Sequence, residues 1–316
     1  MKSYTDDKPL KVGLVGCGQH MSEVLFPMLK LQPEIEITHI ASQSGTSAQI
    51  FAKKWRIQNH SDSWLDLYNS NLDAIVCSGP PQLHQNVALE FSKKRIPTFI
   101  EKPISTHLNE LKKIPLDSLI QIGYNLRFSE SINVLKNLKL NNPNLTFKIE
   151  YHTNKPHQIL WDCSSIIESY LLAVGVHPLS LIQYLVGNIK NTKIITKKIE
   201  DSKIDIQMQI EEENNLRSFI TMSNTSSKFR LEITVFEKGE PIYHMPDMFK
   251  IISLKNQNDS NVIYQMSTLR PVNLCSGYYQ QFLSFFSSVK IKEYNNFKDI
   301  QKSLWIYQTI ESIINE

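Results

Sequence analysis

The first 123 residues alternate short apolar runs with stretches of helical periodicity. Continuous apolar runs of this kind are typical of strands that are buried on both faces of a sheet. Two such runs predict strands at residues 11–15 and 73–77, and further strands fit at residues 34–40, 97–101 and 119–123. Because helical stretches separate them, we expect a doubly wound α/β domain with a parallel sheet over residues 1–123.

The pattern changes after residue 124. Apolar residues at intervals of three and four predict helices at about residues 129–139, 165–186, 278–286 and 298–314. Alternating segments predict strands at residues 145–151, 203–210, 229–236 and 261–266. We therefore expect an α+β C-terminal domain with a mainly antiparallel sheet over residues 124–316, whose last helix could pack back on the first domain.

Composition excludes several classes of protein. A chain of 316 residues is too long for one ordinary hydrophobic core, which agrees with two domains. The formal net charge is only +3 and the basic residues are dispersed, so we expect no nucleic-acid or membrane partner. The polar N-terminus has no signal-peptide core, and no run approaches about 18 apolar residues, so we expect a cytoplasmic protein.

The cysteines lie far apart in the sequence, without the CxxC spacing of zinc sites. In a reducing compartment such residues are seldom paired in disulfides. We expect no bound metal and buried thiols at Cys17, Cys77, Cys163 and Cys275.

A glycine-containing turn follows the first predicted strand and opens a helix. In a dinucleotide-binding Rossmann domain the first glycine, here Gly16, permits a tight turn, and the second, Gly18, lets the backbone approach a pyrophosphate. The alternative is that any tight strand-to-helix turn favours glycine. Met21 stands where the fingerprint usually has Gly or Ala, so we expect looser packing of the helix there. The predicted cofactor contacts are Gly16, Gly18, Gln19, His20 and Met21.

The second predicted strand ends without the acidic residue that would bind a ribose 2′-hydroxyl of NAD. Ser42 stands at that position, followed by Gln43, and both are predicted cofactor contacts. A hydroxyl accommodates a 2′-phosphate without charge repulsion, and Lys53, Lys54 or Arg56 could attract it. We therefore expect NADP, with NAD as the alternative. The other reading is that these cations lie on a solvated face.

Three further segments make the prediction specific: SerGlyProProGlnLeuHis (78–84), GluLysProIleSer (101–105) and GlyTyrAsnLeuArgPheSer (123–129). Together with the GlyCysGly turn, they resemble the Gfo/Idh/MocA oxidoreductase family, closely in the Rossmann half and more loosely beyond it. The resemblance implies an NAD(P)-dependent oxidoreductase that transfers hydride to or from a carbonyl, hydroxyl or imine carbon. It also implies a sugar-like or other small biosynthetic metabolite as substrate, and a homo-oligomer, dimer or tetramer, formed through the second domain.

Lys102, in the GluLysPro segment, matches a family lysine that takes part in the chemistry beside the nicotinamide. The resemblance implies that Lys102 contacts both cofactor and substrate and orients the reacting oxygen, with Glu101 supporting it electrostatically. An ammonium can donate a hydrogen bond where charge changes during the reaction. The alternative is a surface lysine before a turn proline.

The segment after the fourth predicted strand matches the family's cofactor-side loop. The resemblance implies that Ser78, Gly79, Pro80 and His84 contact the nicotinamide ribose or the pyrophosphate. His84 could equally cap or pack on the following helix. Asn125 matches a residue near the domain junction, and we expect it to contact the nicotinamide or the substrate.

The predicted helix at 165–186 carries the main departure from the family pattern. The resemblance implies that His177 exchanges the proton, as a general acid or base with a pKa near neutrality. Ala173 and Ser180 stand where the family usually has aspartates. A lone histidine in an apolar helix is more commonly a core residue. Other predicted substrate contacts are Trp161, Asp162 and Tyr278, with Asp162 a candidate replacement carboxylate and Tyr278 equally readable as core.

Two other classes of function stay open. The family includes non-catalytic members, so a cofactor-binding regulator without turnover is the alternative to an enzyme. The presence of both Lys102 and His177 favours the enzyme. A purely structural interaction module would require that the glycine turn bind no nucleotide.

Overall fold

The computed structural model describes residues 8–255, 261–267, 271–295 and 297–316. The chain forms two compact units. One consists of Met1–Gly123 with Tyr278–Leu304, and the other of Tyr124–Gly277 with Trp305–Glu316. Residues 278–304, which the sequence-based division assigns to the second domain, therefore lie in the first unit.

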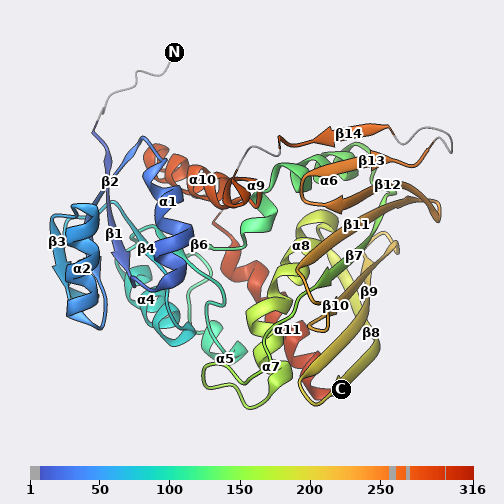
Figure 1. Ribbon diagram of the computed structural model, residues 1–316, viewed down its shortest axis with the longest axis horizontal. Helices are drawn as coiled ribbons and strands as arrows, with labels where there is room; N and C mark the ends of the chain where they lie inside the picture. The colour runs from blue at the N-terminus through green and yellow to red at the C-terminus, as the bar shows by residue number, and fades with distance from the viewer. Residues whose placement is uncertain (1–7, 256–260, 268–270, 296) are drawn as a thin grey trace. The chain divides into compact units, whose positions relative to one another are not determined.

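The first unit contains a six-stranded sheet in the order β3-β2-β1-β4-β5-β6 (Figure 1). All neighbouring strands are parallel, and the order is that of a Rossmann fold. The strands are β1 (Leu10–Val15), β2 (Ile35–Ala41), β3 (Asn59–Ser61), β4 (Ala74–Cys77), β5 (Thr98–Ile100) and β6 (Ile120–Ile122). Every residue of the inner strands β4 and β5 and of the edge strand β6 is buried, as expected for strands covered on both faces.

Helices alternate with these strands along the chain. The first begins with a π-helical turn at Met21–Leu25, where Met21 is fully buried, and continues as α1 (Phe26–Lys30). The others are α2 (Gly45–Trp55), α3 (Leu65–Tyr68), α4 (Pro81–Lys93) and α5 (Leu108–Leu111).

Two helices from the end of the chain return to this sheet: α10 (Tyr278–Ile291) and the beginning of α11 (Asp299–Asn315). The Phe282 ring lies 4.7 Å from the Phe99 ring of β5, centroid to centroid. The Gln121 side chain of β6 donates to the Gln281 carbonyl at 2.9 Å, and the Asp299 carboxylate accepts from the Ile122 N–H at 2.9 Å. These contacts explain why α10 belongs to the first unit.

The second unit contains an eight-stranded sheet in the order β14-β13-β12-β11-β7-β10-β9-β8. The β7–β10 pair is parallel and the other neighbours are antiparallel, so the mainly antiparallel sheet is confirmed. The strands are β7 (Thr146–His152), β8 (Ile189–Glu200), β9 (Lys203–Glu212), β10 (Arg217–Ser223), β11 (Arg230–Glu237), β12 (Glu240–Asp247), β13 (Lys250–Ser253) and β14 (Val262–Gln265).

One face of this sheet is buried. Alternate residues of β9, from Ile204 to Ile210, are fully buried, while their neighbours are partly or fully exposed. The helices of the unit include a 3₁₀ turn (Asn125–Phe128), α6 (Glu130–Asn141), α7 (Ile166–Tyr170), a π-helical turn (Leu171–Gly175), α8 (Val176–Val186) and α9 (Val272–Cys275). The continuous helix Ile166–Val186 is long and apolar enough to cross a membrane, but 78% of its apolar window is buried within the protein, as in a core helix.

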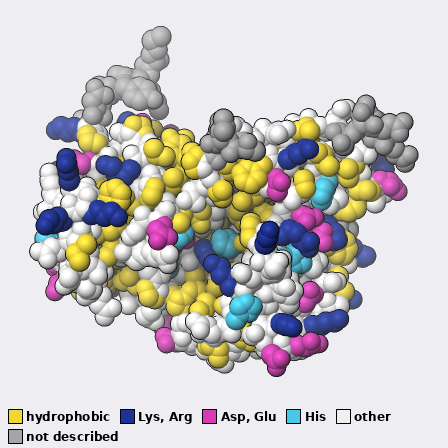
Figure 2. Space-filling view, viewed as in Figure 1, with side chains coloured by type: hydrophobic (Ala, Val, Ile, Leu, Met, Phe, Trp, Pro, Cys, Tyr) yellow, Lys and Arg dark blue, Asp and Glu magenta, His cyan; other side chains and the backbone are white. Residues whose placement is uncertain are grey.

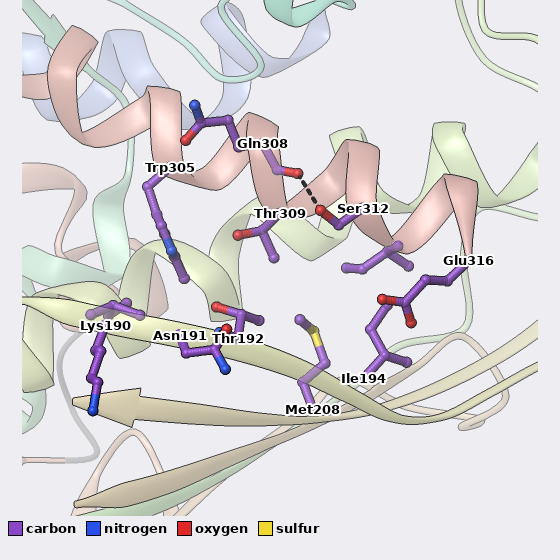
Figure 3. A pocket seen from close by; sticks show the side chains of 12 residues that line it. Lys190, Asn191, Thr192, Ile194, Met208, Trp305, Gln308, Thr309, Ser312 and Glu316 are labelled. Carbon is purple, nitrogen blue, oxygen red and sulfur yellow. Dashed lines mark hydrogen bonds between the residues drawn. The ribbon is translucent and has the colours of Figure 1, made fainter. Parts of the chain in front are cut away.

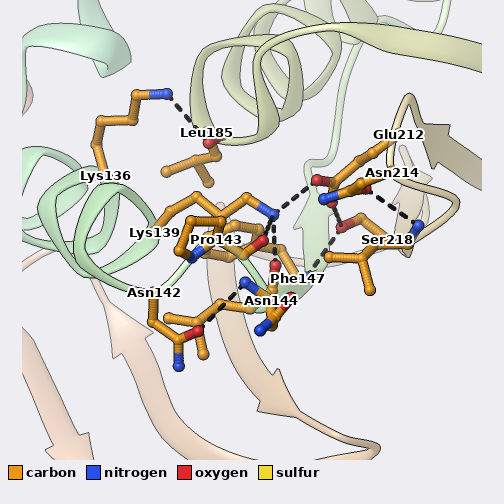
Figure 4. Close-up of polar contacts among 12 residues, drawn as sticks. Lys136, Lys139, Asn142, Pro143, Asn144, Phe147, Leu185, Glu212, Asn214 and Ser218 are labelled. Atoms are coloured by element: carbon orange, nitrogen blue, oxygen red, sulfur yellow. Dashed lines mark hydrogen bonds and ion pairs between the residues drawn. The ribbon is translucent and has the colours of Figure 1, made fainter.

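A buried ion pair joins α6 to β9 (Figure 4). Lys139 Nζ lies 2.6 Å from Glu212 Oε2 and also donates to the carbonyls of Pro143 and Leu145, at 2.9 and 2.7 Å. The two side chains are only 7% and 4% exposed. Both charges therefore depend on protein partners in place of water.

Basic and acidic side chains are interspersed on the face seen in Figure 2. This distribution agrees with the small net charge of +3. No continuous basic stripe is visible on that face.

Candidate functional site

The predicted cofactor residues of the first unit follow the carboxyl ends of its strands. Gly16 and Gly18 follow β1, Ser42 follows β2, Ser78 follows β4, and Lys102 follows β5. In open parallel sheets, ligands bind outside this edge. The topology therefore brings these sequence segments to one edge of one sheet.

The two glycines of the first turn have different structural roles. Gly16 has a φ of +87°, and a Cβ there would collide with the Ser78 carbonyl oxygen, so the fold itself requires glycine. A Cβ at Gly18 would meet no atom within 4 Å. The open space at Gly18 fits a ligand that approaches the backbone, which is the role of the second glycine in dinucleotide sites.

His84 joins two of the loops at this edge. The Gly79 N–H donates to His84 Nε2 at 2.8 Å, so Nδ1 carries the proton that it donates to the Pro103 carbonyl, also at 2.8 Å. The side chain is 1% exposed, and burial lowers the pKa of His84 to about 4, against the opposing effect of the Pro103 hydrogen bond. Both ring nitrogens are used within the protein. The structure thus favours the packing alternative for His84 over ring contact with the cofactor.

We expect His84 to make stability depend on pH between about 4 and 6.5. Its folded-state pKa lies below the ordinary value of 6.5, so the unfolded chain binds the proton first as the pH falls. Stability is then lost over this window, by about 3 kcal/mol at most. Urea unfolding of His84→Gln should show a flatter pH dependence than wild type, whereas the exposed His60→Gln should keep the wild-type slope. An unchanged slope in His84→Gln contradicts this role.

Glu101 is a buried carboxylate beside the predicted catalytic lysine. It is 3% exposed, and its Oε2 accepts the Lys102 backbone N–H at 3.3 Å. A Cβ on Gly123, which follows β6, would lie 2.6 Å from Oε1, so glycine makes room for the carboxylate. Oε1 is buried, and no hydrogen-bond partner for it is found among the described residues. This arrangement holds the Glu101 carboxyl group next to Lys102, whose side chain is partly exposed.

His20 lies between the glycine turn and Glu101. Its Nε2 is 3.7 Å from Glu101 Oε2, and its side chain is 41% exposed. The Tyr278 ring of α10 stands edge-on to it at 5.8 Å between centroids. The structure therefore brings together His20, predicted for the cofactor, and Tyr278, predicted for the substrate.

The cations proposed to attract a 2′-phosphate lie at the wrong end of α2. Ser42 precedes the helix, while Lys53 and Lys54 are in its last turn and Arg56 is its C-cap. Lys53 is eight residues beyond Gly45, or about 12 Å along a helix axis. Lys54 instead lies over the neighbouring Trp55 ring at 5.0 Å. These cations therefore give no support to NADP, and the solvated-face reading fits them better.

Asn125 begins the 3₁₀ turn of the second unit and is 4% exposed. Its side-chain amide donates to the Ser276 carbonyl at 2.8 Å. Its Oδ1 is buried, and no hydrogen-bond partner for it is found in the described part of the chain. An unsatisfied buried acceptor is uncommon in native proteins and is compatible with the predicted ligand contact.

His177 lies in α8, near its start, and is partly exposed. The ring of Tyr151, from β7, is stacked on it at 6.0 Å and 17°. Ser180, at one family aspartate position, donates its hydroxyl to the His177 carbonyl at 3.2 Å and is 1% exposed. The Ser180 hydroxyl therefore forms a hydrogen bond within the helix backbone. Sequence reasoning did not single out Tyr151, because only the position of β7 against α8 brings it to His177.

Trp161 and Asp162 lie in the loop between β7 and α7. Both are exposed, and Trp161 has a φ of +52°, which is unusual for a bulky residue. Such strain commonly occurs at ligand sites. The loop thus presents an aromatic side chain and a carboxylate to solvent, as a substrate-contacting segment would.

Other parts of the described structure are less suited to catalysis. No cluster of three His, Cys, Asp or Glu residues that could hold a metal is found among the described residues. Three of the cysteines are buried, but Cys17, in the glycine turn, is only half-buried. A cavity of about 270 Å³ lies between β8 and the last turns of α11, lined by Lys190, Trp305 and Glu316 among others (Figure 3). None of the predicted site residues lines it.

Residues 10–115 match the family model GFO_IDH_MocA, described as an oxidoreductase family with an NAD-binding Rossmann fold. Two curated relatives come from Bacillus subtilis (strain 168). An uncharacterized oxidoreductase, YrbE, is 21% identical over 191 residues, which cover 57% of this chain and 55% of the relative, so the match spans about half of that protein. Glucose-6-phosphate 3-dehydrogenase is 23% identical over 285 residues, 80% of each chain.

The fold extends over nearly the whole chain. The crystal structure of a dehydrogenase from Chromobacterium violaceum superposes with a TM-score of 0.88 at 21% identity, covering 98% of this chain and 95% of that one. This likeness shows a shared fold, including the second, mainly antiparallel unit. Residues 10–115 are therefore similar to an oxidoreductase family with an NAD-binding Rossmann fold, and nearly the whole chain shares the fold of the Chromobacterium violaceum dehydrogenase.

Proposed function

We propose that this protein is an NAD(P)-dependent oxidoreductase that transfers hydride to or from a sugar-like or other small metabolite. The observation that carries the proposal is the open space at Gly18. The fold requires glycine at position 16 but leaves position 18 free, at the start of a helix whose amides favour an anion. The similarity to glucose-6-phosphate 3-dehydrogenase supports a carbohydrate-like substrate.

The proposed roles follow from the chemistry of the side chains. Bound NAD(P) would supply hydride chemistry. Lys102 would donate a hydrogen bond to the reacting oxygen or nitrogen, and Glu101 would hold it electrostatically. His177 would exchange the proton, with Tyr151 fixing the plane of its ring by stacking. Asn125 Oδ1 would accept from the cofactor or the substrate.

The test is a search for turnover in a panel of sugars, sugar phosphates, polyols and their keto and imino derivatives. Consumption or formation of reduced nicotinamide is followed by absorbance. The proposal predicts turnover with at least one carbohydrate-like member of the panel. Tight dinucleotide binding without turnover on any member would contradict it and would favour a non-catalytic regulator.

We also propose a homo-oligomer, formed through the open face of the second sheet. Along β10, residues alternate between buried and more exposed, and Phe219 on the open side is 39% exposed. Exposed apolar side chains on this sheet face suit a self-complementary contact. Light scattering should give the mass of a dimer or tetramer, and Phe219→Glu should shift it toward the monomer.

A further inference from the structure

The end of β3 supplies a carboxylate beside the position where β2 lacks one. The Ser42 N–H donates to the Ser61 carbonyl at 3.1 Å, and Ala41 is paired with Ser61 in the parallel ladder. Asp62 follows Ser61, the last residue of β3, just as Ser42 follows Ala41, the last residue of β2. Neighbouring strands lie about 4.8 Å apart, so Asp62 stands next to the position of the usual ribose-binding acid.

Asp62 also lies against the beginning of α2. A Cβ on Gly45, the first residue of that helix, would lie 3.1 Å from Asp62 Cβ and 4.0 Å from its carboxyl carbon. Asp62 is exposed, and no hydrogen bond or ion pair of its carboxylate is found among the described residues. The carboxylate is therefore available to a ligand at this edge of the sheet.

The surroundings of Asp62 disfavour a phosphate group. Residues 42–52 and 59–66 contain no Lys or Arg. Ser44 caps α2 by accepting the Ser47 N–H, so part of the helix N-terminus is satisfied internally. Asp66 adds a second carboxylate, which accepts from the Ser61 hydroxyl. The electrostatic potential here favours hydroxyl donors over a dianion.

We propose that Asp62, at the end of β3, binds the adenine ribose hydroxyls and makes the protein prefer NADH to NADPH. A carboxylate accepts hydrogen bonds from ribose hydroxyls and repels a 2′-phosphate. The inference rests on the proposed dinucleotide function. It replaces the expectation of NADP, because a neighbouring strand supplies the acidic group that β2 lacks.

The experiment is a fluorescence titration of the full-length protein with NADH and, separately, with NADPH. Wild type should bind NADH at least about tenfold more tightly than NADPH, since a charged hydrogen bond changes affinity by about that factor or more. Asp62→Asn should weaken NADH binding by about tenfold and strengthen NADPH binding. Adding Ser42→Asp to Asp62→Asn should restore the NADH preference, because it moves the carboxylate to the adjacent strand.

Asp117→Asn is the matched control. It removes one negative charge from the exposed loop before β6, at the opposite edge of the sheet, and should leave both affinities unchanged. Equal binding of the two dinucleotides by wild type, or an Asp62→Asn ratio equal to that of wild type, would overturn the inference while leaving the proposed function intact. Binding of neither dinucleotide by wild type would overturn the proposed function itself.

Discussion

Replacing Lys102 by methionine is expected to lower the rate of hydride transfer by about 10²- to 10⁴-fold, the range for loss of a positioned proton or hydrogen-bond donor. Lys102 follows β5 at the ligand-binding edge of the sheet, beside the buried Glu101 carboxylate. Methionine keeps the length of the side chain but removes the ammonium. Dinucleotide affinity should fall far less than the rate, because the glycine turn that faces the pyrophosphate is untouched. Single-turnover kinetics with the substrate identified in the panel separate the two effects.

The control for this variant is Lys113→Met. Lys113 is an exposed lysine paired with Glu110 on the helix that follows the same strand, and its removal should leave both rate and affinity unchanged. Wild-type hydride transfer by Lys102→Met would show that Lys102 is only a surface residue before a turn proline. Loss of dinucleotide binding together with the rate would assign it to the cofactor alone.

Glu212→Gln is expected to destabilise the protein by about 3–5 kcal/mol, the usual cost of leaving one member of a buried ion pair without its partner. The ammonium of Lys139 would lose the opposite charge of Glu212 and keep only neutral acceptors, which are the carbonyls of Pro143 and Leu145 and the introduced amide oxygen (Figure 4). Ser218, which donates to Glu212 Oε1 at 3.3 Å, would also lose a charged acceptor. Urea unfolding measures the loss.

The double variant Lys139→Met with Glu212→Leu distinguishes an isolated charge from lost packing. Because it removes both charges, it should be less destabilised than the sum of Lys139→Met and Glu212→Leu alone. Glu90→Gln, in the exposed Glu90–Lys93 pair, should cost less than about 1 kcal/mol. A cost for Glu212→Gln as small as that for Glu90→Gln would show that the buried pair does not stabilise the fold.

The sequence predicts the first sheet well because its central strands are apolar on both faces. Five of the six strands were predicted from the sequence, two of them, β1 and β4, from continuous apolar runs. β3 was missed, since AsnHisSer (59–61) is a polar edge strand of three residues with no apolar pattern. The return of α10 to the first unit also has no local signal. It depends on the packing of Phe282 on Phe99 and on the hydrogen bond between Gln121 and Gln281.

The sequence predicted those parts of the candidate site where the backbone conformation permits only one type of residue. Gly16 shows this, because its positive φ and its contact with Ser78 exclude a side chain. The packing role of His84 was not predictable in this way. It depends on a hydrogen bond to the Pro103 carbonyl, which lies 19 positions away in the sequence. The position of Asp62 beside Ser42 could be found only from the pairing of β2 with β3. The distance of Lys53 from Ser42 was also predictable, because the length of the α2 helix alone separates the two residues.

The most direct test of the central claim is the NADH affinity of wild type and of Gly18→Ala, measured by fluorescence titration beside the urea midpoint of each. Because a Cβ at position 18 meets no protein atom within 4 Å, the midpoint should not change. If the backbone there faces a pyrophosphate, NADH affinity should fall at least about tenfold, or by about 1.4 kcal/mol. Wild type that binds no dinucleotide, or Gly18→Ala that binds NADH as wild type does, would contradict the account.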